Sequence, residues 1–171
     1  MQELDAKIRN IPDFPKPGIQ FKDITPLLAD PAMLKLSVNE LVQPFVEQNI
    51  TAVVGMEARG FIFGSLAAAE LNVGFVPLRK PGKLPFNTET VSYDLEYGSA
   101  QLEIHKDALS GSDRVLLVDD LIATGGTAVA SCQLVEKLGA KIVACAFVIE
   151  LDDLKGREEL SKYLVHSLIH Y

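Results

Sequence analysis

The sequence predicts an α/β fold in which helices flank a mostly parallel central sheet. Short apolar segments typical of strands alternate along the chain with segments of helical periodicity. Strands separated by helices imply a parallel sheet that is covered on both faces. Two further segments alternate polar and apolar residues around one glycine, which predicts an antiparallel hairpin inserted into this order.

An extended segment is expected before the first helix. Residues 11–28 contain four prolines, which exclude a long helix there. Asp30 is a typical N-cap, and Pro31 suits the first helical position. Apolar residues then recur at helical spacing, and Pro44 is expected to kink the last turn. These apolar residues are Met33, Leu34, Val38, Leu41, Val42 and Phe45.

Strands and helices alternate through the rest of the chain. The expected strands are residues 50–56, 73–79, 114–119 and 141–151, and the expected helices are residues 58–72 and 125–139. The hairpin is expected from residues 91–97 and 99–105, which flank Gly98. From its pattern alone, this hairpin is simply exposed and half-polar.

Size and charge limit the class of protein. The 171 residues, of which 48% are hydrophobic, predict a single domain over residues 1–171. A net charge of −7 argues against nucleic-acid and membrane partners, and no apolar run is long enough to span a bilayer. The charged N-terminus has no signal-peptide core, and the two cysteines lack CxxC spacing. These features predict a cytoplasmic protein with reduced core thiols.

The stretch from Asp119 to Thr127 has the chemistry of a phosphate site. In parallel sheets, ligands bind beyond the carboxyl ends of the strands, where Asp119 and Asp120 are expected. The following "LIATGGT" turns into a helix, whose first N–H groups and partial positive charge favour an anion. Thr124 and Thr127 add hydroxyl donors. The alternative is an ordinary strand-to-helix turn with a capping acid.

The paired carboxylates cannot themselves bind a phosphate. They can accept hydrogen bonds from a vicinal diol or hold a hydrated divalent cation. A phosphate at one end and a diol at the other describe a ribose 5-phosphate.

Two basic segments suit further anionic groups. Arg59 lies near a helix start between glycines and could bind a diphosphate, although a solvated surface arginine fits the spacing too. Arg79, Lys80 and Lys83 gather in an otherwise acidic chain, which again indicates an anion or else a solvated loop tip. Spacings typical of zinc sites and of serine hydrolases do not occur.

The string "VDDLIATGGT" resembles the phosphoribosyl diphosphate motif of the type I phosphoribosyltransferases. The segments "FPKPGIQFKDITPLL", "EARGFIFG", "RKPGKLP", "LEYG" and "ELDDLKGREEL" resemble, in the same order, the adenine-using members of that family. The resemblance implies the type I phosphoribosyltransferase fold. It also implies a small N-terminal hood over residues 1–30 and a flexible catalytic loop and hairpin lid over about residues 80–106.

The resemblance also implies a reaction of purine salvage. The 5-phosphoribosyl group of 5-phosphoribosyl 1-diphosphate would pass to adenine, giving AMP and diphosphate, with Mg²⁺ as cofactor and a homodimer as the assembly. One alternative is a guanine- or xanthine-type phosphoribosyltransferase. Another is a non-catalytic nucleotide-sensing regulator, which would be expected to lack Arg59 and the lid or to carry an added DNA-binding segment.

Roles for individual residues follow from the same resemblance. It implies catalytic roles for Arg59, at the diphosphate, and Glu96, near the reacting purine nitrogen. Tyr97 would lie close to the phosphoribosyl group, and Arg79 and Lys83 would reach the diphosphate, either within one chain or across a dimer interface. The phosphate loop would comprise Ala123, Thr124, Gly125, Gly126 and Thr127. The substrate would hold most of the Mg²⁺ coordination, with Asp119 and Asp120 nearby.

The adenine site would lie between the N-terminal segment and the end of a strand. The resemblance places Phe21 on one face of the base and Leu151 on the other, with backbone groups around Gln20 and Lys22 at its edge. Ordinary packing of the arm explains Phe21 equally well. The family also often has a cis peptide at the position of Glu57–Ala58, and it commonly has aspartate where this chain has Glu57.

Overall fold

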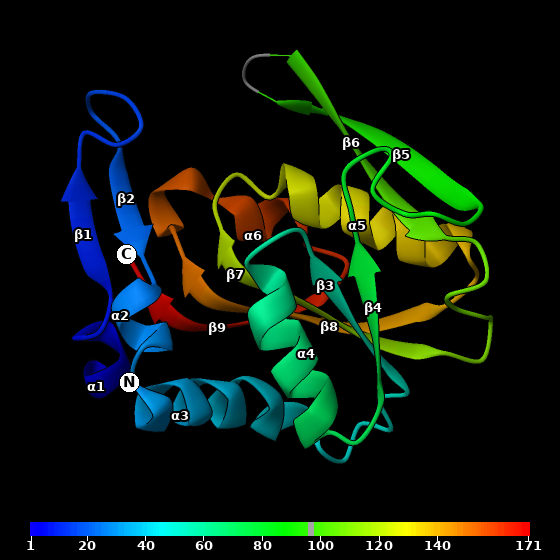
Figure 1. The fold of residues 1–171 in the computed structure, drawn as a ribbon, viewed down its shortest axis with the longest axis horizontal. Coiled ribbons are helices and arrows are strands. Elements are labelled where there is room, and N and C mark those ends of the chain that lie inside the picture. The colour runs from blue at the N-terminus through cyan, green and yellow to red at the C-terminus, as the bar shows by residue number, and fades with distance from the viewer. Residues whose placement is uncertain (96–97) are drawn as a thin grey trace.

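The computed structural model describes residues 1–95 and 98–171, which build one central parallel sheet (Figure 1). Its strands run in the order β4-β3-β7-β8-β9, and every neighbouring pair is parallel. They are β3 (Ala52–Met56), β4 (Gly74–Leu78), β7 (Arg114–Ile122), β8 (Lys141–Glu150) and β9 (Leu164–His170).

Both faces of the sheet are covered, because successive side chains of a strand point to opposite sides. Leu116 of β7 joins one apolar cluster with α3 (Pro31–Val42) and α4 (Gly60–Glu70). Leu117 points the other way, into a second cluster with α5 (Gly126–Lys137). Figure 1 shows α3 and α4 on one side of the sheet and α5 on the other. The predicted parallel sheet with flanking helices is therefore confirmed.

The expected hairpin forms from β5 (Thr88–Leu95) and β6 (Gly98–His105), which pair antiparallel. It lies over α5, on the side of that helix away from the central sheet (Figure 1). A backbone bridge between Arg79 and Glu103 joins β6 to the segment after β4.

The proline-rich N-terminal segment is more regular than expected. After α1 (Gln2–Asp5), β1 (Arg9–Pro12) and β2 (Gln20–Asp23) form a small antiparallel sheet, and α2 (Thr25–Leu28) follows. The prolines at positions 15 and 17 lie in the turn between the strands, where no ladder hydrogen bond is lost. The segment is thus a hairpin rather than a single extended strand.

Two helix predictions are tested at the first long helix. Asp30 caps α3 by accepting hydrogen bonds from the N–H groups of Ala32 and Met33, as expected. The predicted kink at Pro44 is wrong, because α3 ends at Val42 and a 3₁₀ turn, η1 (Gln43–Phe45), follows. A proline has no N–H for the next helical bond, so the helix stops rather than bends.

The length of β7 and the elements after β8 differ most from the sequence-based prediction. β7 continues to Ile122 because it pairs with the longer β8, so Asp119 and Asp120 lie within the strand rather than at its end. η2 (Asp152–Leu154), α6 (Gly156–Glu159) and the edge strand β9 were not anticipated. No helix in the described part of the chain is long and apolar enough to cross a membrane.

Candidate active site

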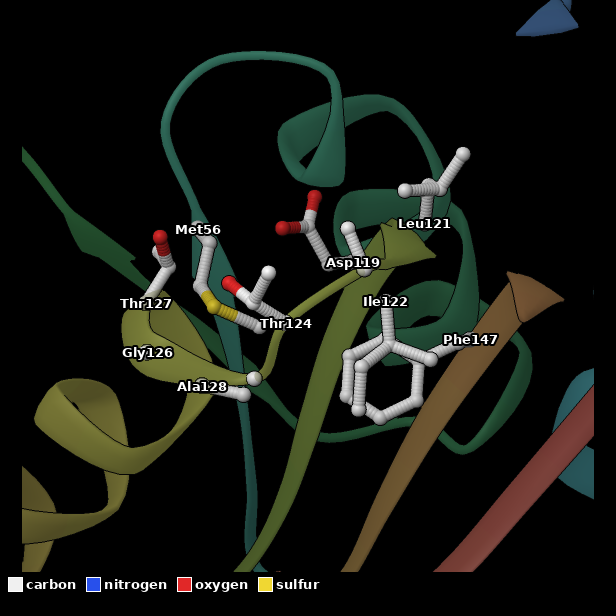
Figure 2. A pocket seen from close by; sticks show the side chains of 11 residues that line it. Met56, Asp119, Leu121, Ile122, Thr124, Gly126, Thr127, Ala128 and Phe147 are labelled. Atoms are coloured by element: carbon white, nitrogen blue, oxygen red, sulfur yellow. The ribbon is translucent and has the colours of Figure 1, made fainter. Parts of the chain in front are cut away.

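A cavity opens at the turn between β7 and α5. Figure 2 shows the carboxylate of Asp119 and the hydroxyls of Thr124 and Thr127 around the same opening. The lining residues are Met56, Asp119, Leu121, Ile122, Ala123, Thr124, Gly125, Gly126, Thr127, Ala128 and Phe147. The structure therefore brings together the whole predicted phosphate loop and one of the two predicted acids.

The loop enters α5 through a left-handed residue. Gly125 has φ +86°, which favours glycine because a side chain would be strained there. α5 then begins at Gly126, and its first-turn N–H groups have no acceptor within the helix. These donors and the helix dipole lie beside the Thr124 and Thr127 hydroxyls, an arrangement suited to a phosphate.

A glycine far along the chain supports this loop. An ideal Cβ on Gly156 would lie 2.2 Å from the carbonyl oxygen of Ala123 and 2.9 Å from the nitrogen of Gly125. The start of α6 thus packs directly against the backbone of the phosphate loop. No local pattern in the sequence indicates this role, although Gly156 is the single glycine in the motif "ELDDLKGREEL".

The two aspartates have different surroundings. Asp119 is partly buried and faces the cavity, and its Oδ1 accepts a hydrogen bond from the N–H of Asp120. Asp120 is only 4% exposed, and its Oδ2 lies 2.9 Å from Nε of Arg59. The Arg59 N–H does not point at that oxygen, so Oδ2 has no hydrogen-bond partner among the described residues. It is a buried acceptor within ion-pair distance of Arg59 that can still accept a hydrogen bond.

Burial makes both carboxylates reluctant to ionise. Burial raises the pKa of Asp119 well above its usual range, and the neighbouring Asp120 raises it further. Burial also raises the pKa of Asp120, although the Arg59 guanidinium opposes this shift. A cation or a set of hydroxyl donors at this place would stabilise the ionised forms.

The loop between β3 and α4 carries Arg59 and approaches β7 closely. An ideal Cβ on Gly60 would lie 2.6 Å from Oδ1 of Asp119, so a side chain at this position would displace the carboxylate. The peptide bond between Glu57 and Ala58 is cis, in agreement with the expectation from the family resemblance.

Glu57 joins this loop to the basic segment. Its Oε2 accepts hydrogen bonds from the N–H of Lys80 at 2.8 Å and from Nε of Arg79 at 3.3 Å. Burial raises the pKa of Glu57, but these two donors outweigh it and hold the pKa below its usual range. Arg79 is therefore half-buried and paired with Glu57, whereas Lys83 lies exposed on the turn. From the sequence, Glu57 was recognisable only as a departure from the family pattern.

Two of the predicted base-binding residues, Phe21 and Lys22, contact residues of other elements. The Phe21 ring lies 5.4 Å from the guanidinium carbon of Arg59, and Nζ of Lys22 lies 3.4 Å from the centre of the Tyr171 ring. Tyr171 exchanges backbone hydrogen bonds with Glu150 and Asp152, the two neighbours of Leu151. Lys22 thus connects β2 to the C-terminal residue, whose backbone is hydrogen-bonded on both sides of Leu151.

The remaining predicted residues fall outside these contacts. Gln20 is exposed, and its side chain accepts a hydrogen bond from Asn10. Glu96 and Tyr97 lie outside the described residues.

A second acidic group does not suit a metal ion. Oxygen and nitrogen atoms of Glu150, Asp152 and His170 lie within 4.8 Å of one another. Arg157, however, donates to both carboxylate oxygens of Glu150, which is only 5% exposed. Burial raises the pKa of Glu150, but this guanidinium outweighs it and lowers the pKa below its usual range. The positive charge that a metal would supply is already present.

Comparisons with known proteins show the family to which the chain is similar. A family model described as "Phosphoribosyl transferase domain" matches residues 25–169. An adenine phosphoribosyltransferase of Methylococcus capsulatus is 71% identical over all of both chains. The crystal structure of an adenine phosphoribosyltransferase from Thermoanaerobacter pseudethanolicus has a TM-score of 0.97 and 49% identity, covering 99% of each chain. The Saccharomyces cerevisiae enzyme, complexed with an imino-altritol bisphosphate and adenine, has a TM-score of 0.93 and 43% identity, covering 98% of this chain and 97% of that one.

Proposed function

The chain belongs to the phosphoribosyl transferase family, and from this premise we infer its reaction. It is a transferase of purine salvage that moves the 5-phosphoribosyl group from 5-phosphoribosyl 1-diphosphate to adenine, giving AMP and diphosphate. The names of its relatives favour adenine over the guanine- or xanthine-type alternative and over the non-catalytic regulator.

One observation carries the assignment on the structural side. A single turn presents the hydroxyls of Thr124 and Thr127, the N-terminus of α5 and the carboxylate of Asp119 to one cavity. We propose that Ala123, Thr124, Gly125, Gly126 and Thr127 bind the 5-phosphate, and that Asp119 and Asp120 accept hydrogen bonds from the ribose hydroxyls. The buried Oδ2 of Asp120 supports this role, because it receives no hydrogen bond from the nearby Arg59 and a ligand hydroxyl would supply one.

The chemistry proceeds at the anomeric carbon of the sugar. As the bond to diphosphate breaks, positive charge develops on the ribosyl group and negative charge on the leaving group. We propose that Arg59 stabilises the departing diphosphate, with Arg79 and Lys83 as further cations. Glu57 supports the proposal for Arg79, because its carboxylate fixes the guanidinium beside the Arg59 loop.

Mg²⁺ fits the donors that the site offers. Asp119 and Asp120 are oxygen ligands of the kind this ion prefers, one oxygen of Asp120 lacks a hydrogen bond, and burial opposes their ionisation without a cation. We propose that the substrate holds most of the coordination and that these acids lie next to it. A bound Mg²⁺ would neutralise charge on the diphosphate.

The base is proposed to lie between Phe21 and Leu151, with backbone groups of Gln20 and Lys22 at its edge. The contact of Lys22 with Tyr171 supports this site, since it ties β2 to the turn that contains Leu151. By family resemblance alone, Glu96 assists proton movement at the purine and Tyr97 contacts the phosphoribosyl group. The hood over residues 1–30 and the lid over about residues 80–106 belong to the same proposal.

The assay is direct. Purified protein is incubated with Mg²⁺, 5-phosphoribosyl 1-diphosphate and one of adenine, guanine, hypoxanthine or xanthine, and nucleotide and diphosphate are quantified. We expect AMP and equimolar diphosphate from adenine, and little product from the other bases. Product from guanine in preference to adenine, or none from any base, would refute the assignment.

Assembly and location need their own measurements. We propose a homodimer in the cytoplasm. Light scattering coupled to size-exclusion chromatography tests the first statement, and a monomeric mass would contradict it. Cell fractionation tests the second.

A further inference from the structure

The first hairpin strand, β5, is attached to α5 at two places. At the end of α5 remote from the cavity, Nζ of Lys137 donates to the carbonyl of Thr90 at 3.1 Å and to Glu89 at 3.3 Å. At the other end, the hydroxyls of Thr127 and Tyr93 are 3.3 Å apart. Figure 1 shows β5 lying over the length of α5. The second attachment lies at the phosphate loop itself.

Thr127 therefore lies between the cavity and Tyr93. Its side chain lines the cavity, as Figure 2 shows, and its hydroxyl donates to the Tyr93 oxygen. A threonine hydroxyl has one hydrogen to donate and two lone pairs that accept. A phosphate offers acceptors, so a Thr127 that binds it must turn its hydrogen away from Tyr93. Tyr93 can then donate to Thr127, and the contact persists with its direction reversed.

We propose that Tyr93 is a positioning residue for the phosphate site. Its hydroxyl holds that of Thr127 in the orientation that donates to the 5-phosphate, in a chain from Tyr93 through Thr127 to the phosphate. Each hydrogen bond in such a chain polarises the next, which strengthens both. The proposal rests on the function inferred above.

The Tyr93 ring has its own packing, which makes the test clean. It is partly buried and packs against the apolar cluster beside α5, so Tyr93→Phe keeps the ring and removes only the hydroxyl. The matched control is Tyr163→Phe, because the Tyr163 hydroxyl also bonds to α5, through Glu136 at 2.8 Å, but far from the loop. Both variants lose one tyrosine hydroxyl that contacts the same helix.

Ribose 5-phosphate and adenine are used as separate binding probes, measured by calorimetric titration. We expect Tyr93→Phe to weaken ribose 5-phosphate binding by about three- to tenfold, the range of one neutral hydrogen bond. Adenine binding should stay within about twofold of wild type, and Tyr163→Phe should leave both constants unchanged. The KM for 5-phosphoribosyl 1-diphosphate should rise in parallel.

A double-mutant cycle identifies the route of the effect. If Tyr93 acts through Thr127, the double variant Tyr93→Phe, Thr127→Val should bind ribose 5-phosphate no more weakly than Thr127→Val alone. Unchanged binding in Tyr93→Phe, equal losses for adenine and ribose 5-phosphate, or losses that multiply in the double variant would each overturn the proposal.

The wild type separates this proposal from the proposed function. Wild-type protein that forms no AMP refutes the function, whatever the variants do. Wild-type protein that forms AMP while Tyr93→Phe binds normally refutes only the role of Tyr93. Wild-type protein that does not bind ribose 5-phosphate overturns both.

Discussion

Gly156→Ala tests how strictly the phosphate loop depends on α6. The new Cβ would lie 2.2 Å from the carbonyl oxygen of Ala123. It would also lie 2.9 Å from the nitrogen of Gly125 and the same distance from Cγ1 of Ile122. Two of these three neighbours are backbone atoms, which cannot rotate away as a flexible side chain could. Something in the loop or in α6 must therefore move.

α6 is less free to move than the phosphate loop. The Arg157 side chain is bonded to Glu150 and, at 2.8 Å, to the carbonyl of Val165, so the start of α6 is anchored to β8 and β9. Restoring an ordinary contact of 3.4 Å from 2.2 Å then requires a shift of about 1.2 Å in the Ala123 carbonyl. Overpacking of this kind costs about 1–3 kcal/mol of folding free energy. A displacement of about 1 Å at a site can cost about 10²-fold in rate.

We therefore expect two changes in Gly156→Ala. Urea denaturation followed by circular dichroism should show a loss of about 1–3 kcal/mol in unfolding free energy. Ribose 5-phosphate affinity and kcat/KM for 5-phosphoribosyl 1-diphosphate should fall by about tenfold or more, while adenine affinity changes little.

Gly111→Ala is the matched control, because the nearest atom to its new Cβ would be 3.8 Å away. If Gly156→Ala keeps the unfolding free energy and the ribose 5-phosphate affinity of the wild type, the reasoning is refuted.

Variants at three positions test the site and its surroundings. Thr127→Val should weaken ribose 5-phosphate binding by about tenfold, because a hydrogen bond to a charged group contributes about 1.5–3 kcal/mol. Thr127→Ser should largely restore it, and equal affinities in all three proteins would contradict the assignment. Asp119→Asn should nearly abolish AMP formation yet stabilise the fold at pH 7 by about 0.5–2 kcal/mol. The reason is that the folded protein disfavours the ionised form of Asp119, as its raised pKa indicates. Thermal melts should show this gain in stability disappearing below about pH 4, where the carboxyl is protonated in the unfolded chain as well. Arg157→Gln should lose about 1.5–3 kcal/mol at pH 7, because Glu150 then stays buried without its partner. Glu150 has a lowered pKa, so its ion pair stabilises the fold above about pH 4.3, the pKa of the unfolded chain, and this stability is lost as the pH falls. If the loss of unfolding free energy in Arg157→Gln did not shrink in acid, the ion pair would not be its cause.

Local patterns were sufficient for most of the fold. Apolar runs separated by helical periodicity predicted β3, β4, β7 and β8, and alternation around Gly98 predicted the hairpin. Such patterns are readable because strand and helix periods act over a few neighbouring residues. β9 carries no such pattern, since Ser167 and His166 interrupt its apolar residues, and it forms because β8 offers it a pairing edge.

The phosphate loop could be predicted from sequence for the same reason. The residues from Asp119 to Thr127 are contiguous, so the strand end, the turn and the start of α5 are specified within one short segment. The family resemblance added residues that no local pattern identifies, among them Phe21 and Leu151.

Only the tertiary structure decided which distant residues share the site. It placed Arg59 against Asp120, Tyr93 against Thr127 and the backbone of the phosphate loop against Gly156. Each of these contacts joins elements that are neighbours only because the strands pair in the order β4-β3-β7-β8-β9 and α5 packs between the sheet and the hairpin. Side-chain periodicity determines which face a residue occupies, but it carries no information about the element that packs opposite. Which elements pack against one another is determined by burial and packing over the whole chain, and the contacts within the site follow from that packing.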